Sequence, residues 1–122
     1  SPTVMKDFLR VYFAGAERET FDVVFLDASH RVIEVEELFA GTLTQTSVYP
    51  REVVKRALHF NAAAVCLSHV HPSSQTEPSR ADEALTSALR QALSLIDVRV
   101  IDHIIVAANG SSLTSMAERG LL

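Results

Sequence analysis

The chain has 122 residues, of which 48% are hydrophobic and 21% are charged, which is the balance of an ordinary globular protein. Its formal net charge of −4 argues against a sequence-independent grip on nucleic acid, which needs clustered Lys and Arg, and leaves room only for a local basic patch. No apolar run is long enough to span a membrane, and no signal peptide is found. The lone Cys66 lies in an apolar run and fits a buried thiol in a reducing compartment, so we expect a cytoplasmic protein.

The first predicted elements are a helix and a β-hairpin. The spacing predicts a helix from Pro2 to Ala14 that stops at Gly15. Residues 20–27 form a strand hydrophobic enough for the centre of a sheet, and residues 32–39 pair with it as a hairpin. Residues 41–49 are polar and form a loop or a further short strand. The apolar positions at helical spacing in the first helix are Val4, Phe8, Val11 and Tyr12.

Helices and strands alternate in the rest of the chain. A helix begins at Pro50 and runs to about Phe60, a buried strand covers 62–67, a third helix runs from Ser79 to about Ile96, and a strand follows at 98–107. Asn109-Gly110 predicts a hairpin turn into a last strand at 111–116. The positions expected to face the core are Val53, Val54, Ala57 and Leu58 in the second helix and Leu85, Ala88, Leu89, Ala92 and Ile96 in the third. This order predicts one α/β domain over residues 1–122, with a mixed sheet flanked by about three helices.

The segment after the buried strand carries the chemistry. His69 and His71 are two residues apart, so on a strand their side chains leave from the same face. Pro72 ends that strand, and Ser79 and Asp82 have the spacing of a capping box at the start of the third helix. Two imidazoles and a carboxylate with a position left for water are the ligands of a catalytic zinc site. A single histidine is usually an ordinary residue and Ser-x-x-Asp is usually only a helix cap, so spacing alone leaves the metal site and the structural interpretation both open.

This segment resembles a known family. His69-x-His71, seven residues, Ser79, two residues and Asp82 match the JAMM (MPN-plus) metalloprotease pattern at every spacing. The RadC family carries this pattern in the form His-Asn-His-Pro-Ser-Gly, which His69 to Ser73 resemble. Val70 and Ser74 depart from the usual Asn and Gly of that form, which puts the shape of the loop in doubt more than the metal. The flanking segments that are similar to the RadC family are Phe25-Leu26-Asp27, Gly41-Thr42, Val48 to Leu58, Asn61 to Ala64 and Asp102 to Val106.

The resemblance implies a JAMM/MPN fold, similar in layout to the cytidine deaminases, with a zinc ion (Zn²⁺) held by His69, His71 and Asp82. The deaminase activity itself is excluded, because the His-x-Glu and Pro-Cys-x-x-Cys zinc pattern is absent. RadC-like proteins also have an N-terminal helical region, and the resemblance suggests that it is missing here. The chain starts at Ser1, so we expect a domain cut from a longer protein.

Hydrolysis of an amide also needs a carboxylate that takes the proton of water and hands it to the leaving amine. In JAMM enzymes this base is a Glu near the start of an early strand, and Glu19 is the best match by position. Glu36 and Glu37 are rivals, and each of the three could instead be a solvated carboxylate at a strand edge. Ser79 has two possible roles, as the helix cap or as the motif serine that hydrogen-bonds the oxyanion or the metal water.

The other histidines are expected outside the ligand set. His103 follows Asp102 within a predicted strand and is interpreted as a core residue or as support behind the ligands, not as a fourth ligand. His30 in a turn and His59 at a helix end are expected to be exposed.

Three functions remain open. The first is a zinc-dependent hydrolase that cleaves a peptide or isopeptide bond in a peptide or protein substrate. The second is a non-enzymatic scaffold, metal-bound or metal-free, that binds a protein partner. The third is a nuclease or DNA-binding repair factor, which the acidic net charge disfavours; the RadC name carries a repair label that no residue pattern supports.

Overall fold

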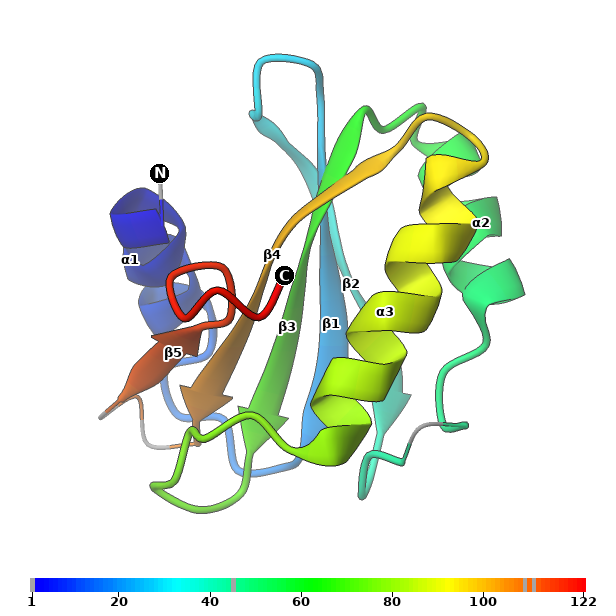
Figure 1. The fold of residues 1–122 in the computed structure, drawn as a ribbon. Helices are drawn as coiled ribbons and strands as arrows, with labels where there is room; N and C mark the ends of the chain where they lie inside the picture. Colours follow the sequence, from blue (N-terminus) through cyan, green and yellow to red (C-terminus); the bar gives the residue numbers. More distant parts are fainter. Residues whose placement is uncertain (1, 45, 109, 111) are drawn as a thin grey trace.

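The structure is a computed structural model that describes residues 2–44, 46–108, 110 and 112–122. In these ranges it contains three helices and one five-stranded sheet (Figure 1). In chain order the elements are α1 (Pro2–Tyr12), β1 (Thr20–Leu26), β2 (Val32–Ala40), α2 (Pro50–His59), β3 (Ala64–His71), α3 (Arg80–Ser94), β4 (Arg99–Ala107) and β5 (Leu113–Ser115).

The sheet is mixed, as the sequence predicts. Its strand order is β2-β1-β3-β4-β5. β1 pairs antiparallel with both β2 and β3, β3 and β4 run parallel, and β5 is antiparallel to β4. A parallel pair needs a crossover connection, and α3 supplies it between β3 and β4. The predicted α/β fold class with its partly antiparallel sheet is therefore confirmed.

Helices cover both faces of the sheet. α1 lies against one face, and α2 and α3 lie side by side against the other (Figure 1). β1 and β3 occupy the middle of the sheet, so both of their faces are covered and nearly all of their residues are buried. On the α2/α3 face the buried side chains include Phe21, Phe25, Val53, Leu85, Leu89 and Leu93. On the α1 face they include Leu9, Phe13, Val24, Cys66, Ile104 and Val106.

Burial determines the character of Cys66. It is fully buried in the α1-side cluster, and burial raises the pKa of its thiol well above the usual value. A thiol that resists ionisation is a poor nucleophile. Cys66 is thus a small core residue, as expected.

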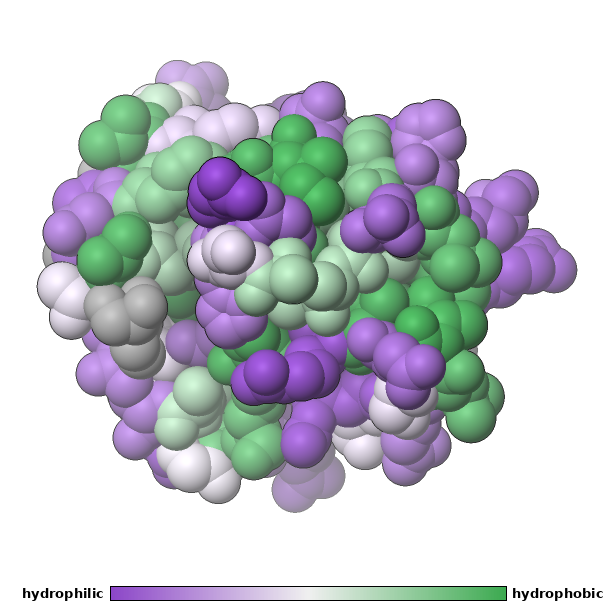
Figure 2. Space-filling view, turned by 90° about the horizontal axis from the view of Figure 1, so that it is seen from above, coloured by the Kyte–Doolittle hydropathy of each residue, from purple (hydrophilic) through white to green (hydrophobic). Residues whose placement is uncertain are grey.

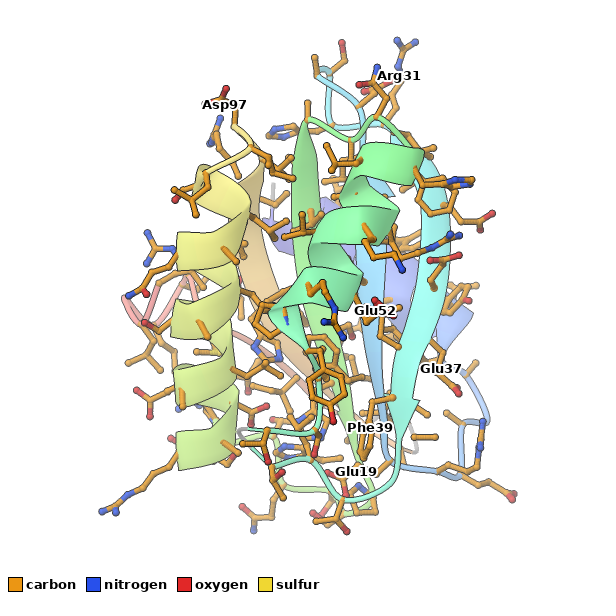
Figure 3. The ribbon with its side chains drawn as sticks, turned by 90° about the vertical axis from the view of Figure 1, so that its right-hand side faces the viewer. Glu19, Arg31, Glu37, Phe39, Glu52 and Asp97 are labelled. Carbon is orange, nitrogen blue, oxygen red and sulfur yellow. The ribbon has the colours of Figure 1, made fainter. Side chains whose placement is uncertain are left out.

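The chain reverses direction so that several functional segments meet at one end of the sheet. β3 ends at His71, α3 begins beside that end, and β1 begins there because it is antiparallel to β3. Figure 3 shows Glu19 at this end and Arg31 and Asp97 at the opposite end. Figure 2 views the molecule from that opposite end, where hydrophilic and hydrophobic side chains are intermixed over the surface.

No helix in the described part of the chain is long and apolar enough to cross a membrane.

The predicted core faces of the helices are wrong at several positions. Val4 and Val11 are 68% and 78% exposed, whereas Leu9 and Phe13 of the neighbouring stripe are buried. α1 has apolar residues on two adjacent stripes, and spacing alone does not say which one meets the sheet. It ends at Tyr12, two residues before the predicted Ala14.

The faces of α2 and α3 are closer to prediction. Val53 and Ala57 are buried, but Leu58 is 60% exposed. In α3 the buried line is Leu85, Leu89 and Leu93, spaced four residues apart, and it leaves Ala88 at the surface. Large side chains thus define the α3 contact, and the small Ala88 falls outside it.

Loops and the last strand differ in detail. The described residues of 41–49 form a loop, not a further strand. Asn109 of the predicted turn and Ser111 of the predicted last strand lie outside the described residues. β5 covers Leu113–Ser115 and pairs with β4, so the predicted antiparallel return is present in a shorter form.

Candidate metal centre

His69 and His71 come together at the end of β3. Their side chains leave the same face of the strand, and their ring centroids are 4.5 Å apart at an interplanar angle of 82°. His69 is buried and His71 is partly exposed. The His69 ring therefore lies at the buried side of the site, and the His71 ring lies at the side that solvent reaches.

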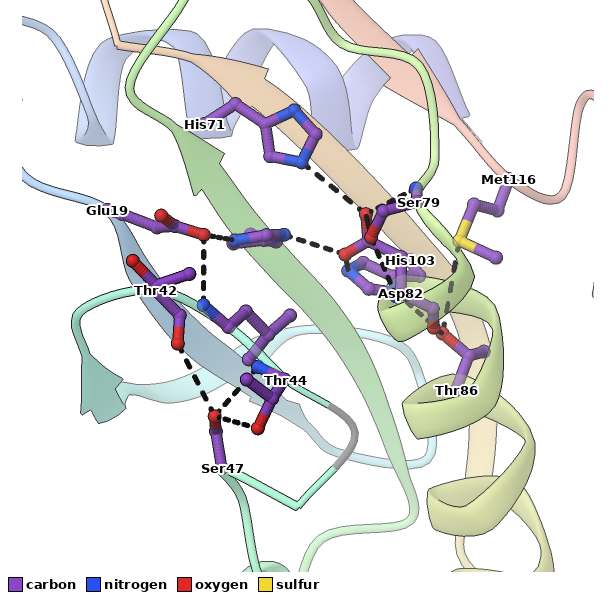
Figure 4. Close-up of polar contacts among 12 residues, drawn as sticks. Glu19, Thr42, Thr44, Ser47, His71, Ser79, Asp82, Thr86, His103 and Met116 are labelled. Atoms are coloured by element: carbon purple, nitrogen blue, oxygen red, sulfur yellow. Dashed lines mark hydrogen bonds and ion pairs between the residues drawn. The ribbon is translucent and has the colours of Figure 1, made fainter.

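Asp82 approaches both rings from the first turn of α3. Its Oδ1 lies 2.7 Å from His69 Nδ1, and its Oδ2 lies 3.4 Å from His71 Nε2 (Figure 4). Burial alone would raise the pKa of Asp82, but the contacts with His69 and His71 outweigh it and hold the pKa well below the usual range. Asp82 is therefore a carboxylate at neutral pH although it is fully buried.

Ser79 fixes the other oxygen of this carboxylate. The backbone N–H of Ser79 and its hydroxyl donate to Asp82 Oδ2 at 2.8 and 2.9 Å, and Ser79 Oγ accepts from the backbone N–H of Asp82 at 3.0 Å. This is the predicted capping box, with both reciprocal hydrogen bonds present. The Ser79 hydroxyl uses its hydrogen for the bond to Asp82 Oδ2 and accepts from the Asp82 N–H. Of its two expected roles, the structure therefore shows the helix cap.

Glu19 lies against the same ring from the opposite side. Its Oε2 is 2.7 Å from His69 Nε2 and accepts a 3.1 Å hydrogen bond from the backbone N–H of Leu43. Its backbone carbonyl accepts from Gly41 N–H at 2.9 Å. The loop after β2 thus holds Glu19 by main-chain groups, with the carboxylate against the His69 ring on the side away from Asp82.

The rival carboxylates lie elsewhere. Glu36 forms a two-pronged ion pair with Arg56 of α2, at 2.7 and 2.6 Å. Glu37 pairs with Arg18 at 3.1 Å. The structure therefore brings Glu19 to the histidines and engages Glu36 and Glu37 with arginines.

Hydrogen bonding sets the tautomer of His71. Its Nδ1 lies 2.8 Å from the backbone carbonyl of Gln75, and since a carbonyl can only accept, this nitrogen carries the hydrogen. The contact with Asp82 raises the pKa of His71. In the neutral ring the lone pair is on Nε2, the nitrogen that faces Asp82. A metal-binding histidine commonly has this pattern, with one nitrogen donating to a carbonyl and the other free to bind.

His103 lies behind Asp82 and is fully buried. Its Nδ1 is 2.6 Å from Thr86 Oγ1, and its Nε2 is 3.7 Å from Asp82 Oδ1. Burial lowers the pKa of His103 to about 4, so the ring is neutral at pH 7. The expected supporting position behind the ligands agrees with this placement, and His30 and His59 are exposed as expected.

Thr86 was missed by the sequence reasoning. It lies on α3 four residues after Asp82, and its hydroxyl contacts both the Asp82 carbonyl and His103. The signal was available, because residues four apart share a helix face. A threonine beside the buried leucines of α3 indicates a buried hydroxyl that needs a hydrogen-bond partner.

The donor set fits a metal ion. One ligand atom from each of His69, His71 and Asp82 lies within 4.8 Å of the others. The set combines imidazole nitrogens with a charged oxygen, which suits zinc and similar divalent metals. The buried His103 Nε2 lies beside this group, 3.7 Å from Asp82 Oδ1, and has no hydrogen-bond partner in the described part of the chain. The three residues can therefore hold a divalent cation.

The chain is similar to known proteins over its whole length. A family model described as RadC-like JAB domain matches residues 1–121. A UPF0758 protein of Variovorax paradoxus is 65% identical over 122 residues, which are all of this chain and 53% of that protein. UPF0758 proteins of Methylibium petroleiphilum and Acidovorax sp. are each 61% identical over the whole chain, which covers 54% and 50% of their lengths. The chain thus spans about half the length of the curated relatives it matches. With its five-stranded mixed sheet and its His-His-Asp triad, the chain belongs to the RadC family and forms a RadC-like JAB domain with the residues of a JAMM-type metal site.

Proposed function

We propose that this domain is a zinc-dependent hydrolase of the JAMM type that cleaves a peptide or isopeptide bond. One observation carries the proposal: the Glu19 carboxylate lies 2.7 Å from His69 Nε2, at the edge of the His69, His71 and Asp82 group. A scaffold that only held a metal would not need a second carboxylate at this position. The proposal extends to a cytoplasmic location, with a peptide or protein as substrate.

The residues divide the chemistry between them. His69, His71 and Asp82 would hold the zinc ion, which when bound lowers the pKa of water and polarises a carbonyl oxygen. The Glu19 carboxylate takes a proton from the attacking water and donates it to the leaving nitrogen, so that the amine departs neutral. Leu43 N–H and His69 keep the Glu19 carboxylate within the site.

Ser79 has a secondary part in the proposal. Its hydroxyl donates to Asp82 Oδ2, and this contact orients the metal-binding carboxylate. To stabilise a developing oxyanion as well, the hydroxyl would have to turn away from Asp82 during the reaction. We therefore assign Ser79 first to Asp82 and second to the substrate.

A DNA-repair role has no part in the proposal. The net charge is −4. Among the described residues, no Lys or Arg side chain is bonded to Glu19, His69, His71 or Asp82.

The test begins with zinc content and continues with turnover. Purified protein equilibrated with zinc and desalted is expected to carry about one zinc per chain, and a His69→Ala/His71→Ala double variant none. Wild type, Glu19→Gln and the matched control Glu17→Gln are then assayed on fluorogenic peptide and isopeptide libraries. Glu17 is exposed and lies two residues away.

Glu19→Gln is expected to keep its zinc and to lose turnover by roughly 100- to 10,000-fold, which is the usual contribution of a general base. Glu17→Gln should match wild type. Full activity in Glu19→Gln would refute the assignment of Glu19 as the base. Zinc binding without turnover on any substrate would favour the scaffold function.

A further inference from the structure

A pair of buried polar residues lies behind Asp82 and has no part in the proposed mechanism. His103 on β4 is 0% exposed and Thr86 on α3 is 2% exposed. They contact each other, and both contact Asp82. Figure 4 shows them on the side of Asp82 away from Glu19. Buried polar groups are costly unless they are hydrogen-bonded, so the position of each proton matters here.

The contacts of Thr86 determine where its proton lies. Thr86 Oγ1 is 2.6 Å from the Asp82 carbonyl oxygen and 2.6 Å from His103 Nδ1. A hydroxyl has one hydrogen, and the carbonyl can only accept. The hydroxyl therefore donates to the carbonyl, and its oxygen accepts the hydrogen of His103 Nδ1.

This arrangement leaves a bare lone pair on the other ring nitrogen. His103 Nε2 has no hydrogen-bond partner in the described part of the chain, and it faces Asp82 Oδ1 at 3.7 Å. The ring is closed in on another side by Phe21, whose ring meets it edge to face at a centroid distance of 5.8 Å. Thr86 and Phe21 together keep the imidazole from turning.

We propose that His103, held by Thr86, is a positioning residue of the metal centre that directs the Asp82 carboxylate toward His69 and His71. Two acceptors repel each other, so the lone pair on Nε2 keeps Oδ1 on the side of His69. The same lone pair raises the electron density around Asp82 and so favours a bound cation. Both effects increase the affinity for a divalent metal. The inference rests on the metal-binding part of the proposed function.

Two substitutions at Thr86 separate positioning from packing. Thr86→Val keeps the shape and loses the hydroxyl, whereas Thr86→Ser keeps the hydroxyl and loses a methyl group. His103→Phe keeps an aromatic ring and loses both nitrogens. Leu93→Ala, at the far end of α3 from Asp82, is the control for general loss of core packing, since Leu93 is fully buried.

Zinc affinity is measured by competition with a chromophoric chelator, on protein shown to be folded by circular dichroism. Thr86→Val and His103→Phe are expected to bind zinc about 10- to 100-fold more weakly, as is usual when support behind a ligand is removed. Thr86→Ser should stay close to wild type, and Leu93→Ala should lose stability but keep its affinity. The visible spectrum of the cobalt-substituted protein should change in Thr86→Val and not in Thr86→Ser.

A second readout does not require metal. Nitrogen-15 NMR of the imidazole should find the hydrogen of His103 on Nδ1 in wild type and Thr86→Ser. A hydrogen on Nε2 in wild type would overturn the inference.

The outcomes also separate this inference from the proposed function. Equal zinc affinity in wild type, Thr86→Val and His103→Phe would overturn the positioning role and leave the hydrolase proposal in place. Absence of zinc binding by wild type would overturn both. If His103→Phe did not fold, the Thr86 pair would still decide.

Discussion

Asp22 and Asp82 are both buried carboxylates, one on a strand and one on a helix, and their pKa values are shifted in opposite directions. Asp22 lies on β1 and, by strand alternation, faces α1, because Phe21 and Val23 face the other helices. Burial raises its pKa to about 6. Asp82, on the α3 side, has a pKa held well below the usual range.

The difference comes from the neighbours of each carboxylate. Burial raises both pKa values, since it penalises the charged form. Asp82 has His69, His71 and Ser79 around it and so stays charged. Asp22 accepts one hydrogen bond from Thr20, at 2.7 Å, and lies in the field of Glu37, which Arg18 partly offsets. A buried carboxylate thus marks a cation site only when donors surround it.

The largest expected effect comes from Asp82→Asn, which keeps the shape and removes the charge. We expect loss of zinc from the purified protein and a fall in unfolding free energy of about 3 kcal/mol or more at pH 7, since breaking a buried ion pair leaves its partners uncompensated. The folded-state pKa of Asp82 is depressed, so its contribution is present above pH 4 or so and is lost as the pH falls. Urea unfolding with chelator present measures this, and the exposed neighbour Glu83→Gln is the control. Unchanged stability would show that the histidine contacts do not stabilise the charge.

Asp22→Asn should have the opposite sign. The folded-state pKa is about 6, above the unfolded value near 4, so wild-type stability falls as the pH rises between these values and stays lower above them. The variant avoids this loss and should gain up to about 3 kcal/mol at pH 8, with no gain at pH 4. Urea unfolding at pH 4, 6 and 8 is the measurement, with the exposed Asp7→Asn as control. Destabilisation at pH 8 would mean that the Asp22 carboxylate is stabilised by its surroundings.

Ser79→Ala tests the donors of Asp82 alone. The variant loses the hydroxyl that caps α3 and donates to Asp82 Oδ2, and we expect a loss of about 1 kcal/mol, typical of an N-cap. Ser87→Ala, an exposed position on the same helix, should cost far less in the same thermal unfolding assay. Equal losses of stability in Ser79→Ala and Ser87→Ala would show that the Ser79 hydroxyl does not stabilise the start of α3.

The smallest effect is expected from Thr20→Val. Its hydroxyl donates to Asp22 Oδ1 and lowers the pKa of that carboxyl against the effect of burial. Without it the pKa of Asp22 should rise further, with a stability change within about 1 kcal/mol. A carbon-13 NMR titration of the Asp22 carboxyl measures the shift, and an unchanged midpoint would show that the Thr20 contact is not formed in solution.

The order of elements could be predicted from sequence because it depends on local patterns. Pro50, Pro72 and the Ser79 to Asp82 spacing each mark a boundary that the structure confirms within a residue or two. The buried face of α1 could not be predicted from sequence, because its apolar residues occupy two adjacent stripes. Only packing against the sheet determines which stripe is buried.

For the site, local spacing was enough for the part that lies within one segment. His69, His71 and Asp82 belong to 14 consecutive residues, and their meeting follows from a strand, a short loop and a helix cap. Glu19 is 50 residues from His69, and its place depends on the antiparallel register of β1 and β3. Nothing in the local sequence fixes that register, which is why Glu19 rested on family resemblance and on position before the strand.

The hold on Glu19 has a consequence for variation. Leu43 grips the carboxylate through its backbone N–H, and every amino acid except proline carries that group. The loop can therefore exchange its exposed side chains without moving Glu19. The outer surface of such a loop can diverge in sequence while the position of the Glu19 carboxylate beside His69 is inherited unchanged.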